Sequence, residues 1–128
     1  MRELQAGEVI PEWSLRLTPT TIVSTAIATR DWQDVHHDRD VAQAAGSKDI
    51  FMNILTSNGM VERYVADWLG HDCELKGIAI RLGAPAYPYD TLTFSGTVAS
   101  IQDGVATLDV VGRVSLGDHV IATVKVLA

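Results

Sequence analysis

Cysteine is almost absent from this chain. Cys73 is the only thiol among 128 residues, so no disulfide can form within the chain. A lone thiol is typical of a reducing compartment. Long apolar runs are also missing: the longest stretch without a charge, 13 residues from Leu17 to Thr29, is too short and too rich in Thr to cross a bilayer. The start, Met1 to Gln5, lacks the basic flank and apolar run of a signal peptide. We therefore expect a cytoplasmic protein without a membrane partner.

Basic charge is scarce as well. Ten Lys and Arg residues stand against 16 Asp and Glu, which gives a formal net charge of -6. A nucleic-acid-binding domain would show a clustered basic face, so we expect no nucleic-acid partner. A few well-placed cations could still hold a phosphorylated ligand. Repeats, low-complexity segments and Pro- or Gly-rich linkers are lacking, and residues 1–128 are predicted to form a single domain.

The first part of the chain has a weak pattern. Residues 1–20 show no clear period and are predicted to form an arm that wraps the surface before the first strand. Thr21 to Thr29 is β-branched and uncharged, which predicts a buried strand. A polar segment from Arg30 to Asp40 follows and concentrates acids and histidines. A short helix is plausible from Arg39 to Ala45.

The second part is strongly patterned. Apolar side chains recur at helical spacing between Asn53 and Leu69, with Asn53 as a possible N-cap and Gly70 as a stop. They are Ile54, Val61, Tyr64, Val65 and Trp68. After Gly70, turn signals separate four predicted strands: Leu75 to Leu82, Thr91 to Ile101, Val105 to Val114 and His119 to Leu127.

The order of elements indicates the fold class. It reads as strand, polar loop, one long helix and four antiparallel strands. One helix with an apolar face and a five-stranded sheet can bury each other if the sheet curls around the helix. We therefore expect an α+β protein with a hot-dog fold. An α+β roll of another topology is the alternative.

Asp31 and His36 are the candidate catalytic pair. They lie five residues apart in the polar loop, and a carboxylate and an imidazole at one water could accept and deliver protons near neutral pH. A solvated turn is the more frequent use of such a loop. A metal site is a third reading, because Asp34, His37 and Asp38 add oxygen and nitrogen ligands. We expect no metal, since neighbouring His side chains diverge and the chain has no second ligand cluster.

The start of the long helix supplies a complementary group. Unpaired N–H groups near Asn53, at the positive end of the helix dipole, could bind an oxygen that gains negative charge during a reaction. An ordinary capped helix has the same sequence pattern.

The segment from Ala28 to Asp38 resembles the catalytic segment of the MaoC-like, or (R)-specific, enoyl-CoA hydratases. Their pattern is Asp-x-Asn-Pro-x-His, and Asp31 and His36 match its catalytic pair. Gln33 replaces the Asn and Asp34 the Pro. Asn53 matches a Gly whose backbone N–H faces the thioester oxygen in the family, so the resemblance implies the same role for the Asn53 N–H, with an added side chain near the thioester.

Further strings resemble one branch of this family, the small catalytic subunits of two-subunit steroid side-chain hydratases of bacterial cholesterol degradation. The resemblance covers about Ile22 to Val126. It includes Gly46 to Leu55, Arg63 to Trp68, Arg81 to Pro85, Tyr89 to Thr91, Gly112-Arg113 and Gly117 to His119.

The resemblance implies hydration of a trans-2-enoyl-CoA. Asp31 and His36 would hold one water over C3, and the product would be a 3-hydroxyacyl-CoA. Coenzyme A would enter as part of the substrate, without a further cofactor. Two alternatives remain open: a hot-dog thioesterase, in which water attacks the carbonyl, and a non-catalytic scaffold subunit of a hydratase complex.

Two sets of residues are candidates for substrate binding. The candidates for coenzyme A are the cations Lys48, Arg63, Arg81 and Arg113, and the candidates for a bulky acyl pocket are Trp32, Phe51, Met52 and Tyr87. For each of them, a solvated surface or core position is the more common use. The resemblance implies a larger hot-dog partner subunit in a heterotetramer, and a homodimer when the chain is alone.

Overall fold

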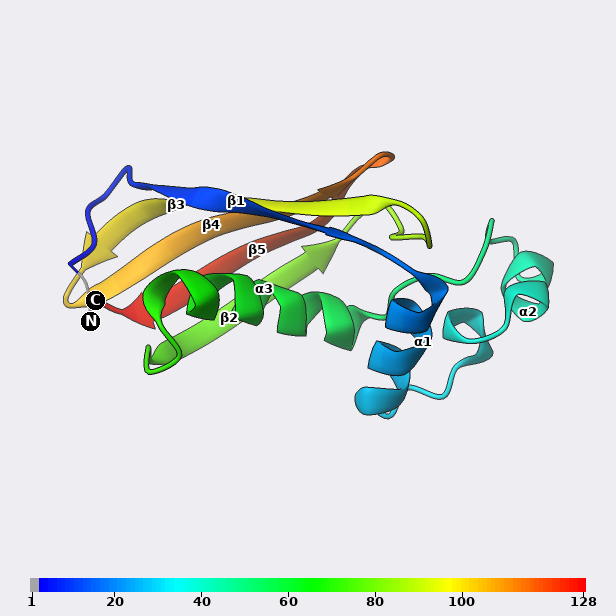
Figure 1. The fold of residues 1–128 in the computed structure, drawn as a ribbon. Helices are drawn as coiled ribbons and strands as arrows, with labels where there is room; N and C mark the ends of the chain where they lie inside the picture. Colours follow the sequence, from blue (N-terminus) through cyan, green and yellow to red (C-terminus); the bar gives the residue numbers. More distant parts are fainter. Residues whose placement is uncertain (1–2) are drawn as a thin grey trace.

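A five-stranded antiparallel sheet dominates the computed structural model, which describes residues 3–128 (Figure 1). The strand order is β1-β3-β4-β5-β2, so β1 and β2 form the two edges. The bounds are Val9–Arg16 for β1, Leu75–Leu82 for β2, Thr91–Gln102 for β3, Val105–Val114 for β4 and Gly117–Leu127 for β5.

The helix α3, Ile54–Leu69, lies along one face of this sheet (Figure 1). Its side chains Val61, Tyr64 and Val65 are buried against alternate residues of the central strands, such as Phe94 and Leu108. Burial alternates along β3 and β4, as expected for a sheet with one covered face. The predicted hot-dog arrangement is confirmed. Ile54, predicted to lie on the buried face of the helix, is instead half exposed.

The predicted strand from Thr21 to Thr29 is wrong. These residues belong to helix α1, Pro19–Ala28. Thr18 caps the helix by accepting the N–H of Thr21, and Pro19 has the backbone angle of a first helical turn. The buried residues are Ile22 and Ala26, four apart, which is helical spacing. Threonine hydroxyls donate to carbonyls one turn back, so the β-branched composition does not prevent a helix.

The predicted N-terminal arm is also wrong, because residues 9–16 form the edge strand β1. The strand pairs with β3, and its register shifts by one residue between Ile10 and Trp13. This bulge contains Pro11, which has no N–H to donate to the ladder. The bulge interrupts the alternation of apolar and polar residues and so hides the strand in the sequence. Tyr64 of α3 donates its hydroxyl to the Pro11 carbonyl and fixes the bulge to the helix.

The remaining elements agree with prediction to within two residues. The helix α2 is Arg39–Ala44, and Asn53 and Gly70 cap α3. A 3-10 turn that was not predicted, η1, covers Asp34–His36 within the polar loop. Asp103 and Gly104 both have positive φ angles, 54° and 76°, which fits the tight hairpin predicted between β3 and β4. Among residues 3–128, no helix has the length and apolar character needed to cross a bilayer.

The helices α1 and α2 gather beyond the end of the sheet where α3 begins (Figure 1). The polar loop between them therefore lies next to the N-terminus of α3. This juxtaposition brings Asp31, His36 and Asn53 together.

Candidate active site

The end of α1 places Asp31. The Asp31 N–H donates to the Ala26 carbonyl and the Arg30 N–H to the Ile27 carbonyl, the two bonds of a Schellman C-cap. Arg30 occupies the left-handed position of this motif with φ of 57°, where glycine is the usual residue. His37 donates its Nε2–H to the Asp31 carbonyl over 2.7 Å. Asp31 is therefore held by its backbone on both sides.

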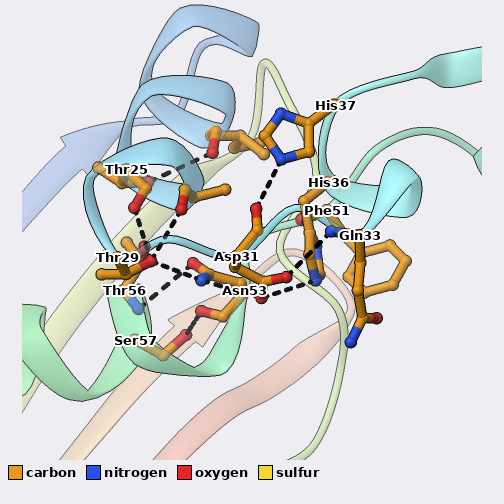
Figure 2. A network of polar contacts seen from close by, with 12 residues as sticks. Thr25, Thr29, Asp31, Gln33, His36, His37, Phe51, Asn53, Thr56 and Ser57 are labelled. Atoms are coloured by element: carbon orange, nitrogen blue, oxygen red, sulfur yellow. Dashed lines mark hydrogen bonds and ion pairs between the residues drawn. The ribbon is translucent and has the colours of Figure 1, made fainter.

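His36 follows from η1 and is buried. Its Nδ1 lies 2.7 Å from the Phe51 carbonyl, which can only accept, so Nδ1 carries a proton. The opposite nitrogen, Nε2, then faces Asp31 Oδ2 at 3.4 Å (Figure 2). The Phe51 ring packs edge-on against the imidazole, with 4.9 Å between ring centroids. One backbone bond and one aromatic contact thus fix the imidazole toward the carboxylate.

The Asp31 carboxylate accepts two hydrogen bonds. The Gln33 N–H donates to Oδ1 at 3.2 Å, and the Asn53 amide donates to Oδ2 at 3.2 Å. Burial by itself raises the pKa of Asp31. The two hydrogen bonds and the nearby His36 and His37 outweigh it, and the pKa lies below its ordinary value of 3.8. The group is therefore held as a carboxylate at neutral pH.

The pair opens into a cleft of about 310 Å³. Its wall is mostly apolar, and one side is the segment that continues β2. The lining residues are Asp31, Gln33, His36, Phe51, Met52, Ile54, Leu82, Gly83, Ala84, Pro85 and His119. A carboxylate and an imidazole that line an apolar cleft can hold a water against a ligand that enters it.

Asn53 stands between the lining residues Met52 and Ile54 in the sequence and is 1 % exposed. Its Oδ1 accepts the N–H of Thr56 at 3.3 Å, which makes it the N-cap of α3. Its Nδ2 donates to Thr29 Oγ1 at 2.9 Å and to Asp31 Oδ2 (Figure 2). The resemblance implies an Asn53 side chain near the thioester, and in the structure its amide is turned to the Asp31 carboxylate.

His119 is a residue of the cleft that the sequence analysis did not predict. It is buried, and its Nδ1 donates to the Ala84 carbonyl at 2.7 Å. Its Nε2 then accepts the hydroxyl of Ser57, also at 2.7 Å. Burial lowers the pKa of His119 despite this bond to Ala84, so the ring is neutral. His119 connects the cleft wall to the first turn of α3, and the two contacting residues are 62 positions apart in the sequence. No local sequence pattern predicts such a contact.

The other candidate binding residues lie in different places. Phe51 and Met52 line the cleft. Lys48 and Tyr87 line a neighbouring cavity of about 430 Å³, with 5.6 Å between the ammonium and the ring. Trp32 is exposed and stacks with His37.

The remaining three cations lie on other elements. Arg63 covers the Trp13 ring and pairs with Asp67, Arg113 pairs with Asp118, and Arg81 is exposed on β2. The cleft lining contains neither Lys nor Arg. In the part of the chain that the structure describes, three His, Cys, Asp or Glu side chains nowhere gather as a metal site would require.

Comparison with known proteins identifies the family. Residues 5–119 match the family described as MaoC like domain. The chain belongs to this MaoC-like family. It is 62% identical over 119 residues to the 3-oxo-4,17-pregnadiene-20-carboxyl-CoA hydratase beta subunit of Mycobacterium tuberculosis, covering 93% of this chain and 92% of that protein.

Solved structures of related proteins have the same fold as this MaoC-like chain. A chain of the ChsH1-ChsH2 complex from Mycobacterium tuberculosis superposes with a TM-score of 0.95 at 59% identity, covering 98% of both chains. The (R)-hydratase of A. caviae involved in PHA biosynthesis superposes with a TM-score of 0.88 over 98% of both chains. Its identity is 17%, so this likeness shows the fold.

Proposed function

We propose that the chain is an enoyl-CoA hydratase subunit that adds water across the double bond next to the thioester of a 2-enoyl-CoA. The observation that carries the proposal is the pair of Asp31 and His36, 3.4 Å apart in the lining of an apolar cleft. The hydratase activity of the relative with 62% identity supports the same reaction.

The orientation of His36 suggests how protons move. Its Nδ1 proton is committed to the Phe51 carbonyl, so a second proton on Nε2 makes an imidazolium that the Asp31 carboxylate stabilises. The carboxylate then accepts a proton from water as the water oxygen bonds to C3. The double-bond electrons move toward the thioester oxygen, and His36 delivers its Nε2 proton to C2. Transfer of a proton from Asp31 to His36 restores the pair.

The thioester oxygen gains negative charge in this reaction and needs a donor. Thr56 has its N–H satisfied by the Asn53 side chain, whereas no contact in the described chain occupies the N–H of Asn53 itself. We assign this N–H, at the positive end of the α3 dipole, to the thioester oxygen. The reaction adds water and involves no oxidation, so coenzyme A enters only as part of the substrate.

The substrate is proposed from the relative's name. In a 3-oxo-4,17-pregnadiene-20-carboxyl-CoA the double bond joins a side-chain carbon to the steroid ring, so hydration places a tertiary hydroxyl on the ring. The relatives are named as a beta subunit and as part of a two-protein complex. We propose that this chain likewise works with a larger hot-dog subunit. A cytoplasmic location is proposed with it, and the free thiol of Cys73 agrees with a reducing compartment.

Co-purification from the native cell, with mass identification of the partner, supplies the complex for the test. The complex is incubated with 3-oxo-4,17-pregnadiene-20-carboxyl-CoA, and products are separated by chromatography with mass detection. We expect a product heavier by one water. Release of free coenzyme A without any hydrated thioester would instead assign a thioesterase. Full activity of a complex that carries Asp31→Asn and His36→Ala would make this chain a scaffold.

A further inference from the structure

Both carboxylate oxygens of Asp31 are occupied, and the donors differ in kind. Oδ1 accepts a backbone N–H from Gln33, two residues away in the same loop. Oδ2 accepts a side-chain donor from Asn53, 22 residues away on another element, and the same oxygen faces His36. Among the described residues, Asn53 is the hydrogen-bond donor that connects this oxygen directly to the start of α3.

The orientation of the Asn53 amide follows from its partners. The backbone N–H of Thr56 can only donate, so the atom facing it is Oδ1. The Asp31 carboxylate can only accept, so the atom facing it is Nδ2. Thr29 Oγ1 donates its own proton to the carbonyls of α1, which leaves a lone pair for the second Nδ2 proton. The amide thus has one arrangement that satisfies all its contacts, and the side chain is almost fully buried.

We propose that Asn53 is a positioning residue, whose side chain holds the Asp31 carboxylate in the orientation that faces His36. This role rests on the hydratase reaction proposed above. The residue then has two separable functions at the start of α3. Its backbone N–H faces the thioester, and its amide group fixes the proton acceptor. One residue thereby sets the distance between the donor to the thioester oxygen and the carboxylate that accepts the proton of water.

Two substitutions separate this role from helix capping. Asn53→Ser and Asn53→Asp both keep an oxygen that caps α3, and both keep the backbone N–H. The Ser side chain is too short to reach Asp31. The Asp side chain places a second carboxylate against it. The other titratable groups near Asp31 are His36 and His37, with His119 across the cleft, and neither variant changes them.

We expect kcat of the reconstituted complex with the steroidal enoyl-CoA to fall by about ten- to a hundredfold in both variants, the effect of one hydrogen bond to a charged group. The KM should change little, because no contact with the substrate is removed. The acid limb of the pH profile should move to higher pH, further for Asn53→Asp than for Asn53→Ser, because like charge disfavours ionisation of Asp31 more than a lost donor does.

Thr18→Ala is the control for cap loss. Thr18 caps α1 in the same way, by accepting the N–H of Thr21, so this variant should lower the melting temperature and leave the acid limb in place. If Asn53→Ser and Asn53→Asp also leave the acid limb at the pH of the parent, and if their kcat stays within twofold of the parent value, Asn53 is only a helix cap and the proposal is wrong.

A second measurement does not depend on activity. Carboxyl-labelled aspartate in the isolated chain reports the titration of Asp31 by NMR, with Asp31→Asn as the assignment control. Asn53→Ser should move this titration to higher pH, and an unchanged titration overturns the proposal. If the titration moves while the parent complex makes no hydrated product, the positioning contact stands and the hydratase assignment fails.

Discussion

Gly83 has no room for a side chain, and its substitution tests the wall of the cleft. A Cβ built on Gly83 would lie 2.4 Å from the Asp118 carbonyl oxygen. The same stretch of backbone is held against β5 by two hydrogen bonds of 2.8 Å, from Gly83 N–H to the His119 carbonyl and from Ala84 N–H to the Asp118 carbonyl. Alanine at this position therefore pushes directly against the part of β5 to which this backbone is hydrogen-bonded.

The expected cost follows from the geometry. Ordinary contact begins at 3.4 Å, so the two segments must separate by about 1 Å, which stretches both hydrogen bonds beyond their useful range. Overpacking costs about 1–3 kcal/mol and each lost hydrogen bond about 1 kcal/mol, so Gly83→Ala should destabilise the chain by about 2–5 kcal/mol. Chemical denaturation of the isolated chain measures this.

Gly77→Ala is the matched control, because Gly77 lies in β2, the edge strand that Gly83 follows, and nothing lies within 4 Å of an added Cβ. We expect a gain of up to about 1 kcal/mol, since alanine restricts the unfolded chain more than glycine does. Gly83 also lines the cleft, so Gly83→Ala should lower kcat/KM of the complex while Gly77→Ala leaves it unchanged. Equal stability of Gly83→Ala and the parent would refute the reasoning.

Three further outcomes follow from the site and the core. Asp31→Asn and His36→Gln should each lower kcat by about a hundredfold to ten-thousandfold without a large change in melting temperature, and a loss below fivefold would contradict acid-base roles. His119 is neutral because burial lowers its pKa, so the stability it contributes is full above its ordinary pKa of 6.5 and is lost as pH falls below that value. Denaturation between pH 7.5 and 5 should show this loss in the parent and a flatter profile in His119→Gln; the same slope in both would assign the loss to other groups. Thr56 Oγ1 is buried without a partner in the described residues, so Thr56→Val should raise the melting temperature by about 3–6 °C, measured by circular dichroism, and a lower value would show that the hydroxyl is satisfied.

The sequence predicted the second half of the fold because its signals are local. Alternating burial in β3 and β4, the Asp103-Gly104 hairpin and the caps of α3 each depend on a few neighbouring residues. The prediction of the first half was wrong where amino-acid composition and the spacing of apolar residues indicate different structures. Residues 21–29 have the composition of a strand, but the Thr18-Pro19 cap and the burial of Ile22 and Ala26 follow a helix. Weighting the cap above the composition would have found α1.

The candidate site divides in the same way. Asp31 and His36 stand in one loop at a recognisable spacing, so sequence comparison alone could nominate them. Asn53 reaches Asp31 across 22 residues, and His119 reaches Ser57 across 62. These contacts exist only because α1 ends where α3 begins and because β5 returns beside β2. Side chains that position a catalytic group are set by topology, which a single sequence does not display.

The size and charge of the cleft bear on the need for a partner. Sites for drug-sized ligands usually enclose about 300–1,000 Å³, and this cleft has about 310 Å³. The proposed substrate, a steroid joined to coenzyme A, is far larger than such a ligand, and the cleft lining has no Lys or Arg to bind its phosphates. Lys48 and Arg39 line a separate cavity beside Tyr87. Under the proposed function, the described chain supplies the reacting groups and one wall of the site, and most of the substrate surface is covered from outside it. A second subunit against this cleft is the arrangement that meets this requirement.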